Sequence, residues 1–134
     1  MSNFAETFKS TLQQIEQSRD PEALVALFGS DAELLNLALT EPMKGEEGAR
    51  KFWSNYLSAF DKVESKFHHS SDAENTAVLE WVSEGVIAAT GQPFNYRGIS
   101  VVEHDGEKVH KFRTYYDSAV FLPGGAKHKE HSLE

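Results

Sequence analysis

Hydrophobic side chains recur at helical spacing in the first half of the chain and alternate in strand-like fashion in the second half. Near the start, the apolar positions lie three and four residues apart: Phe4, Phe8, Leu12 and Ile15. This period predicts an amphipathic helix from Asn3 to about Gln17.

Two further helices and one short strand are predicted before the chain reaches its midpoint. Asp20-Pro21 is typical of a helix start, with Asp20 as the N-cap and Pro21 in the first helical position. The short helix that follows is predicted to end at Gly29-Ser30. Residues 32–39 are predicted to form a strand, 40–45 a loop, and the wide apolar stripe over 46–60 a third helix.

The remaining sequence predicts strands over 63–69, 76–89, 94–103 and 108–122, separated by polar or glycine-containing turns, including a polar turn over 70–75. Helices followed by adjacent antiparallel strands predict an α+β domain. In this layout a curved antiparallel sheet carries the three helices on its concave side.

The last two strands meet at Asp105-Gly106, a dipeptide typical of tight type I′ hairpin turns. Side chains alternate along a strand, so the last strand has one distinctly polar face, on which we expect any chemistry to lie. That face carries Lys111, Arg113, Tyr115 and Asp117. The alternate positions are predicted to be exposed and to suit a dimer interface; they are Phe112, Thr114 and Tyr116.

The 134 residues fit a single domain, predicted over 1–122, followed by a polar tail over 123–134 whose last two residues resemble a cloning remnant. No cysteine is present, which excludes disulfides and thiolate metal sites. The formal net charge of −8 argues against nucleic acids and anionic membranes as partners, because both require a basic face. No signal-like or membrane-spanning segment is found, so we expect a cytoplasmic location.

Three blocks share an order and spacing with a known group of proteins. They are Asp20–Phe28 followed by Asp31-Ala32, the glycine within Lys44–Phe52 that opens the third helix, and the closing segment Asp105–Val109 with Arg113–Asp117. Over 4–121 the chain resembles the nuclear transport factor 2-like superfamily, most closely its SnoaL-like and ketosteroid isomerase-like branches. The resemblance implies a cone-shaped, cystatin-like fold that encloses one apolar pocket, usually in a homodimer.

The resemblance also implies chemistry for one residue. In SnoaL-like cyclases and related epoxide hydrolase-like enzymes, the last Asp of the closing signature is the acid/base, and Asp117 matches it. Other positions depart from the family pattern. Asn36 stands where ketosteroid isomerases carry their catalytic Asp, Leu12 lies near their oxyanion-hole Tyr, and 80–84 lacks the Arg-x-Asp pair of the epoxide hydrolases. A complete machinery of either kind is therefore not expected.

Asp117 and Tyr115 are the catalytic candidates. A carboxylate in an apolar pocket is a stronger base, and a tyrosine hydroxyl can donate a hydrogen bond to a developing enolate or bound carbonyl. Arg113 and Asn36 are predicted ligand contacts. Structural alternatives stay open: Asp117 paired with Arg113 or bonded to backbone amides, Arg113 on a solvated or dimer-facing surface, and the Asn36 amide satisfied by backbone.

Aromatic residues with core-like spacing are also expected to line part of the pocket and to bind ligand: Trp53, Tyr56, Trp81 and Phe94. Glu80 and Glu84 face either the pocket, as further acid/base candidates, or solvent and cross-strand partners. His68 and His69 point to opposite faces of a strand, so we assign no metal site and expect no cofactor.

The leading functional hypothesis is a cofactor-independent isomerase or cyclase that acts on a small, largely apolar carbonyl compound. Asp117 would move the proton while Tyr115 or Asn36 steadies the oxygen. The alternative is a module of the same fold that binds a small apolar ligand without converting it, or that serves in dimerisation.

Overall fold

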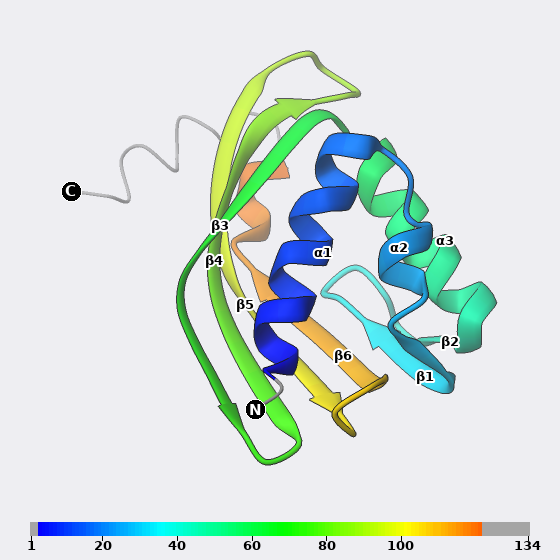
Figure 1. The fold of residues 1–134 in the computed structure, drawn as a ribbon. Helices are drawn as coiled ribbons and strands as arrows, with labels where there is room; N and C mark the ends of the chain where they lie inside the picture. Colours follow the sequence, from blue (N-terminus) through cyan, green and yellow to red (C-terminus); the bar gives the residue numbers. More distant parts are fainter. Residues whose placement is uncertain (1–2, 122–134) are drawn as a thin grey trace.

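The computed structural model describes residues 3–121 of the 134 and consists of one curved six-stranded sheet with all its helices on the concave side (Figure 1). The α+β class predicted from the sequence is confirmed. In chain order the elements are α1 (Phe4–Ser18), α2 (Glu22–Val25), β1 (Phe28–Leu35), β2 (Met43–Lys44), α3 (Gly45–Ser58), β3 (Phe60–Ala73), β4 (Thr76–Ile87), β5 (Pro93–His104), β6 (Val109–Tyr116) and the 3₁₀ helix η1 (Ser118–Phe121). The predicted tail over 123–134 lies outside the described residues.

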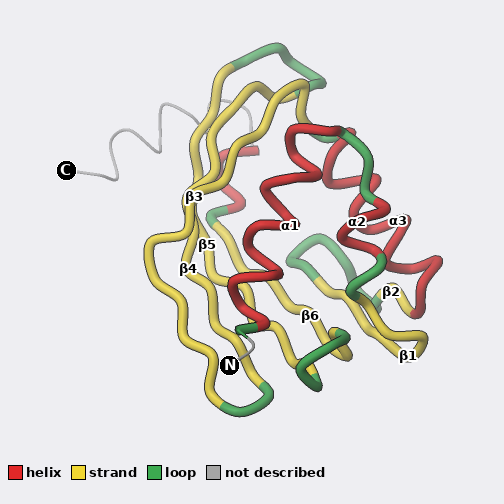
Figure 2. The backbone as a smooth tube through the Cα atoms, viewed as in Figure 1, coloured by secondary structure: helices red, strands yellow, loops and turns green. Residues whose placement is uncertain are grey.

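The sheet is mixed, in the order β2-β1-β6-β5-β4-β3. The long strands β3 to β6 pair antiparallel as predicted, but β1 runs parallel to β6. In the tube view of Figure 2 the bent β3–β4–β5 layer curves around the helices. This curvature creates the concave space that the helices only partly fill.

Helix α1 is held at both ends. Asn3 Oδ1 accepts the N–H of Glu6 at 3.2 Å, and the chain leaves the helix at Arg19, which has the left-handed φ of 66° and donates its N–H to Ile15 O. The Arg19 guanidinium donates to the carbonyls of Leu57 and Phe60. One side chain thus joins the end of α1 to the turn between α3 and β3.

The second helix is shorter than predicted, and the first strand begins earlier. Helix α2 ends at Val25, and β1 begins at Phe28, so Gly29 and Ser30 belong to the strand instead of ending the helix. The cause is a distant partner: Val109 N donates to Leu27 O at 2.7 Å, and Phe28 pairs with Val109 of β6. The predicted strand over 32–39 was therefore placed too late.

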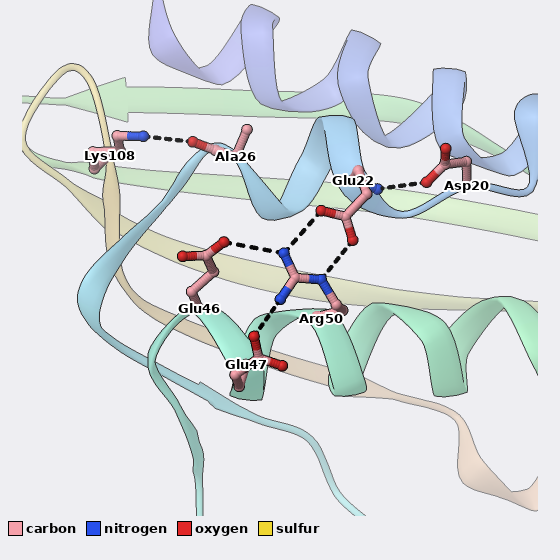
Figure 3. Close-up of polar contacts among 7 residues, drawn as sticks. All are labelled: Asp20, Glu22, Ala26, Glu46, Glu47, Arg50 and Lys108. Atoms are coloured by element: carbon pink, nitrogen blue, oxygen red, sulfur yellow. Dashed lines mark hydrogen bonds and ion pairs between the residues drawn. The ribbon is translucent and has the colours of Figure 1, made fainter.

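Helices α2 and α3 are joined by a surface ion-pair cluster around Arg50 (Figure 3). The guanidinium binds both carboxylate oxygens of Glu22, through Nε at 2.6 Å and a terminal nitrogen at 2.9 Å. It also contacts Glu46 and Glu47 of its own helix. Asp20 accepts the Glu22 N–H at 3.0 Å, so it caps the short helix from one position before the assigned N-cap, Pro21.

The turns between the long strands differ in detail from the prediction. Strand β3 continues to Ala73, through most of the predicted polar turn. At the β5–β6 hairpin only Gly106 has a positive φ, of 94°, which excludes the predicted type I′ turn. Instead, Asp105 Oδ1 accepts the N–H groups of Glu107 and Lys108 and organises a wider loop.

Buried residues form two adjoining clusters between the sheet and the helices. The larger one contains stacked and edge-on rings contributed by α1, α3 and β6, namely Phe8, Phe52, Trp53 and Phe112. The smaller one surrounds Phe60, Phe94 and Tyr96. Within residues 3–121, no helix is long and apolar enough to cross a membrane.

Candidate functional site

A cavity of about 540 Å³ lies between the concave face of the sheet and helices α1 and α3. This volume is within the usual range for small-molecule sites, about 300–1,000 Å³. Its walls include Phe52, Trp53, Trp81 and Phe112, which are all buried. Leu37 and Phe121 also line the cavity yet are 49% and 42% exposed, so they give it an apolar edge open to solvent.

Two pairs of hydroxyl groups line the sheet wall of the cavity. Four adjacent strands each contribute one serine or threonine: Ser65 from β3, Ser83 from β4, Ser100 from β5 and Thr114 from β6. Ser65 is hydrogen-bonded to Ser83 at 2.6 Å, and Ser100 to Thr114 at 2.9 Å. The two pairs are offset along the strands, because Ser83 is paired with Tyr96 and Ser100 with Leu79. The largely apolar cavity therefore has donors and acceptors at two places on this wall.

Gly98 allows the indole of Trp81 to form part of this wall. A Cβ on Gly98 would lie 2.3 Å from Tyr115 O and 2.7 Å from the Trp81 ring, so no larger residue fits. Because the indole can lie across β5, its Nε1 reaches Ser100 Oγ at 2.9 Å. That bond leaves the Trp81 donor satisfied and links it to the Ser100–Thr114 pair.

Next to the Ser65–Ser83 pair lies a buried carboxyl group, that of Glu16 on α1, with only 5% of the residue exposed. Its Oε2 accepts hydrogen bonds from Tyr56 Oη and Ser65 Oγ, both at 2.6 Å, and its Oε1 accepts the Ser65 N–H at 2.8 Å. No Lys, Arg or His among residues 3–121 forms an ion pair with Glu16, so neutral donors alone hold this carboxyl.

Burial raises the pKa of the Glu16 carboxyl, and the hydrogen bonds from Ser65 and Tyr56 offset only part of that rise. Burial also raises the pKa of Tyr56 well above its usual value, and the neighbouring Glu16 adds to the effect. Tyr56 is therefore a neutral hydroxyl donor at physiological pH. Glu16 is a carboxyl group that holds its proton more readily than an exposed glutamate does.

Four of the predicted ligand-binding residues line the cavity: Asn36, Trp53, Tyr56 and Trp81. Asn36 also accepts the Ala38 N–H on its own Oδ1 at 2.9 Å, so its amide oxygen has a backbone partner. Phe94 is not among the lining residues. It stacks on Phe60, with ring centroids 4.7 Å apart, and supports the cavity wall from behind.

The two faces of β6 are the reverse of the prediction. Phe112, Thr114 and Tyr116, expected at a dimer interface, line the cavity instead. Arg113 and Tyr115 lie on the outer face of the sheet, where Arg113 forms an ion pair with Glu103 of β5 and Tyr115 is 47% exposed. The alternation was predicted correctly, but the large apolar Phe112 packs in the core. Thr114 and Tyr116 share its face of the strand and therefore also point inward.

Asp117 follows β6 directly and lies between two cavity-lining residues, Tyr116 and Ser118, without lining the cavity itself. Its Oδ1 accepts the N–H of Ala119 at 3.2 Å, at the start of η1, and its N–H donates to Arg97 O. Glu80 and Glu84 are exposed on the outer face of the sheet, which agrees with the solvent-facing alternative.

Sequence reasoning missed Glu16 and the two hydroxyl pairs, although signals for both were present. Glu16 continues the four-residue series Phe4, Phe8 and Leu12, so it faces inward with them. Ser83 and Ser100 alternate with exposed or half-buried residues on their strands, and the buried face is the one toward the cavity. Within the described part of the chain, no three His, Asp or Glu side chains are grouped to hold a metal ion.

The family model of the SnoaL-like domain matches residues 11–112. This match covers most of the chain, so the protein belongs to the SnoaL-like domain family. No functionally curated protein matches the sequence.

Solved structures similar to this chain share its fold at low sequence identity. A protein with a ketosteroid isomerase-like fold from Catenulispora acidiphila, in complex with trimethylamine, is 19% identical with a TM-score of 0.78, over 90% of this chain and 92% of that one. An NTF2-like protein from Anabaena variabilis is 20% identical with a TM-score of 0.75, over 85% and 87%. An LEH-like epoxide hydrolase from M. tuberculosis is 16% identical with a TM-score of 0.70, over 95% and 92%.

Proposed function

We propose that this member of the SnoaL-like family binds a small, largely apolar molecule that carries at least one carbonyl or hydroxyl oxygen. The observation that carries the proposal is the largely apolar cavity of about 540 Å³ with two hydrogen-bonded hydroxyl pairs on its sheet wall. Apolar walls would supply most of the affinity, and the hydroxyls would orient the oxygen. The exposed Leu37 and Phe121 at the cavity edge favour the entry of an apolar molecule.

Intrinsic fluorescence tests this proposal directly. The chain has two tryptophans, Trp53 and Trp81, and both line the cavity. A titration with a steroid ketone, an aromatic polyketide and a terpenoid ketone should give a saturable change for at least one class. At about 100 times its Kd, that ligand should stabilise the protein by about 2.7 kcal/mol in a thermal melt. The absence of a saturable change with all three classes would contradict the proposal.

The role of the Ser100–Thr114 hydroxyl pair is tested by Thr114→Val, which removes a hydroxyl and keeps the side-chain shape. For a ligand with a carbonyl, the affinity should fall about fivefold, equivalent to about 1 kcal/mol for one hydrogen bond. For the matching hydrocarbon without the oxygen, it should be unchanged. Equal losses for both ligands would mean that the substitution disturbs the cavity shape instead.

A second candidate function is a cofactor-independent isomerase or cyclase that uses the same cavity. The observation that favours it is the buried Glu16 carboxyl, which is hydrogen-bonded to two cavity-lining hydroxyls, those of Tyr56 and Ser65. General acid–base catalysis needs a group with a shifted proton affinity close to the ligand. The test is whether a carbonyl compound that binds is also isomerised, with the reaction followed in deuterated water. Turnover would separate this function from binding alone.

A further inference from the structure

The Glu16 carboxyl lies between two separate hollows of the molecule. On one side is the cavity, lined by Ser65, Ser83 and Tyr56. On the other side is an outer cleft of about 660 Å³, lined by Glu16 itself, again by Ser65, and by polar and charged groups from α1 and β3. Ser65 therefore borders both hollows, and Glu16 lines the outer one.

A continuous set of short hydrogen bonds connects the carboxyl to the cavity. Ser65 Oγ is 2.6 Å from both Glu16 Oε2 and Ser83 Oγ. A hydroxyl has one proton to donate, so when Glu16 is ionised, Ser65 donates to the carboxylate and Ser83 donates to Ser65. Tyr56 reaches the same carboxylate oxygen directly from the cavity wall.

We propose that Glu16 is the proton donor and acceptor that serves the cavity, acting through the Ser65 and Ser83 hydroxyls and recharged by water in the outer cleft. This inference rests on the proposed function, because it requires an oxygen-bearing ligand in the cavity. Glu16 does not touch that ligand; it acts through the two serines and is therefore a positioning residue. Ser83 is the last hydroxyl in the series.

The proton transfer balances without any other reactant. The Glu16 O–H bond breaks as Ser65 Oγ gains that proton; Ser65 passes its own proton to Ser83, and Ser83 passes its own to the ligand oxygen. Both serines end as neutral hydroxyls, the ligand has gained one proton, and Glu16 is a carboxylate. A proton from bulk solvent, carried by water in the outer cleft, then returns to Glu16; the reverse sequence removes a proton from a ligand and releases it to solvent.

The surroundings of Glu16 favour a carboxyl group that gains and loses a proton over one that stays ionised. Burial and the charge of Glu64 on β3 raise the pKa of the carboxyl. The hydroxyls of Tyr56 on α3 and Ser65 on β3 lower it, and Tyr96 on β5 is electrostatically coupled to it. The charged groups that line the outer cleft with it are Arg19, Asp61, Lys62 and Glu64. The pH at which the neutral and ionised forms of Glu16 exchange is thus higher than for an ordinary glutamate.

A titration of the free protein tests the connection. With glutamate labelled by ¹³C at the side-chain carboxyl, the Glu16 resonance is identified by its loss in Glu16→Gln. We expect the Glu16 carboxyl to titrate at a higher pH than the exposed glutamates do, and to do so while the protein stays folded. Tyr56→Phe should raise its midpoint further, because the carboxylate loses a direct donor. Ser83→Ala should also raise it, because Ser65 loses the hydrogen bond that strengthens its own donation to the carboxylate.

Ser100→Ala is the matched control, because Ser100 is a buried cavity serine that bonds to Trp81 and Thr114 instead of to the Glu16 group. It should leave the Glu16 midpoint unchanged. A Glu16 carboxyl that titrates only as the protein unfolds, or that ignores Ser83→Ala, would overturn the proposal.

Occupied protein gives a second test with two named molecules, 2-naphthol and naphthalene. They fill similar space, but only 2-naphthol has a hydroxyl to meet Ser83. We expect 2-naphthol to move the Glu16 midpoint by about half a unit more than naphthalene does, and Ser83→Ala to abolish the difference. Equal midpoints with both molecules bound would overturn the relay. Failure of both to bind would count against the proposed ligand class instead, and the free-protein titration would still decide the role of Glu16.

Discussion

At the scale of single residues, two roles can be compared for Asp117: the one expected from the family and a local structural one. The resemblance predicts an acid/base, whereas the carboxylate accepts the Ala119 N–H at the start of η1. That helix carries Ser118 and Phe121, which line the cavity. A capping role would place Asp117 in support of the cavity wall.

Two substitutions at Asp117 distinguish these roles. Asp117→Asn keeps an oxygen that can accept the Ala119 N–H, so ligand affinity and stability should be almost unchanged. Asp117→Ala removes the cap and should destabilise the protein by about 1 kcal/mol and weaken ligand binding. Thermal melts and the tryptophan fluorescence titration provide the readout. If Asp117→Asn abolishes turnover of a substrate and leaves binding intact, the acid/base role is correct.

Glu16 should make stability depend on pH in a defined direction. Its pKa is higher in the folded state than the ordinary value of 4.5, so folded protein binds more protons than unfolded protein between the two values. The contribution of Glu16 to stability is therefore greatest below about pH 4.5, and it is lost as pH rises through the pKa of the folded state. Each unit of difference corresponds to about 1.4 kcal/mol.

Glu16→Gln should remove this pH-dependent loss. Denaturant unfolding of both proteins at several pH values should show that the variant gains on wild type as pH rises, until the difference becomes constant above the folded pKa. Asp61→Asn is the control, because Asp61 is an exposed acid of the same cleft and its substitution reports the general effect of removing one negative charge there. A constant difference between Glu16→Gln and wild type across the range would contradict the raised pKa.

At the scale of the elements, Arg19 combines a strained backbone with a cross-link between elements. The left-handed φ of 66° costs an ordinary residue about 1 kcal/mol relative to glycine. The guanidinium contacts with Leu57 and Phe60 carbonyls offset that cost and hold α1 against the α3–β3 turn. The residue therefore combines two opposing contributions to stability.

A pair of variants measures these contributions separately. Arg19→Ala should lose about 1–3 kcal/mol, since charge-assisted hydrogen bonds are lost while the strained backbone remains. Arg19→Gly should be about 1 kcal/mol more stable than Arg19→Ala, because glycine adopts the left-handed region without strain. Urea unfolding midpoints give both numbers. Equal stability of the two variants would mean that the backbone strain is absent.

The elements also show where prediction from sequence reaches its limit. The periods of Phe4–Ile15 and of the long strands are local patterns, and they predicted the helices and the antiparallel order. The start of β1 at Phe28 depends on Val109, eighty-one positions later by residue number, and no local pattern contains that partner. For β6 the alternation was readable, but which face meets the core depended on packing around Phe112.

The candidate site was predictable only in part for the same reason. Trp53, Tyr56 and Trp81 were correctly expected at the cavity because large aromatic residues on the apolar faces of their elements must point inward. Glu16 and Ser83 looked like ordinary polar positions. Their role follows from contacts between α1, β3 and β4, which only the folded arrangement brings together.

At the scale of the whole molecule, no helix of residues 3–121 covers the outer face of the sheet (Figure 1), and its central strands carry exposed apolar side chains. Val78, Ile99 and Tyr115 are 39%, 43% and 47% exposed, on the adjacent strands β4, β5 and β6. Ile99 is paired directly with Tyr115. Exposed apolar residues clustered in this way are typical of interaction sites, and we propose that a second copy of the chain covers them.

Ile99→Asp should therefore dissociate the dimer, because it would bury a charge at the centre of the contact; a loss of about 2 kcal/mol would weaken dimer affinity roughly thirtyfold. Leu37→Asp is the matched control, since Leu37 is also an exposed apolar residue, at 49%, but it lies at the cavity edge. Sedimentation velocity over a range of concentrations should show weakened association only for Ile99→Asp. Because the outer face and the cavity lie on opposite sides of the sheet, Ile99→Asp should keep its ligand-induced fluorescence change, whereas Leu37→Asp should reduce it. A wild type that remains monomeric at every concentration would contradict the dimer and leave the cavity proposal unaffected.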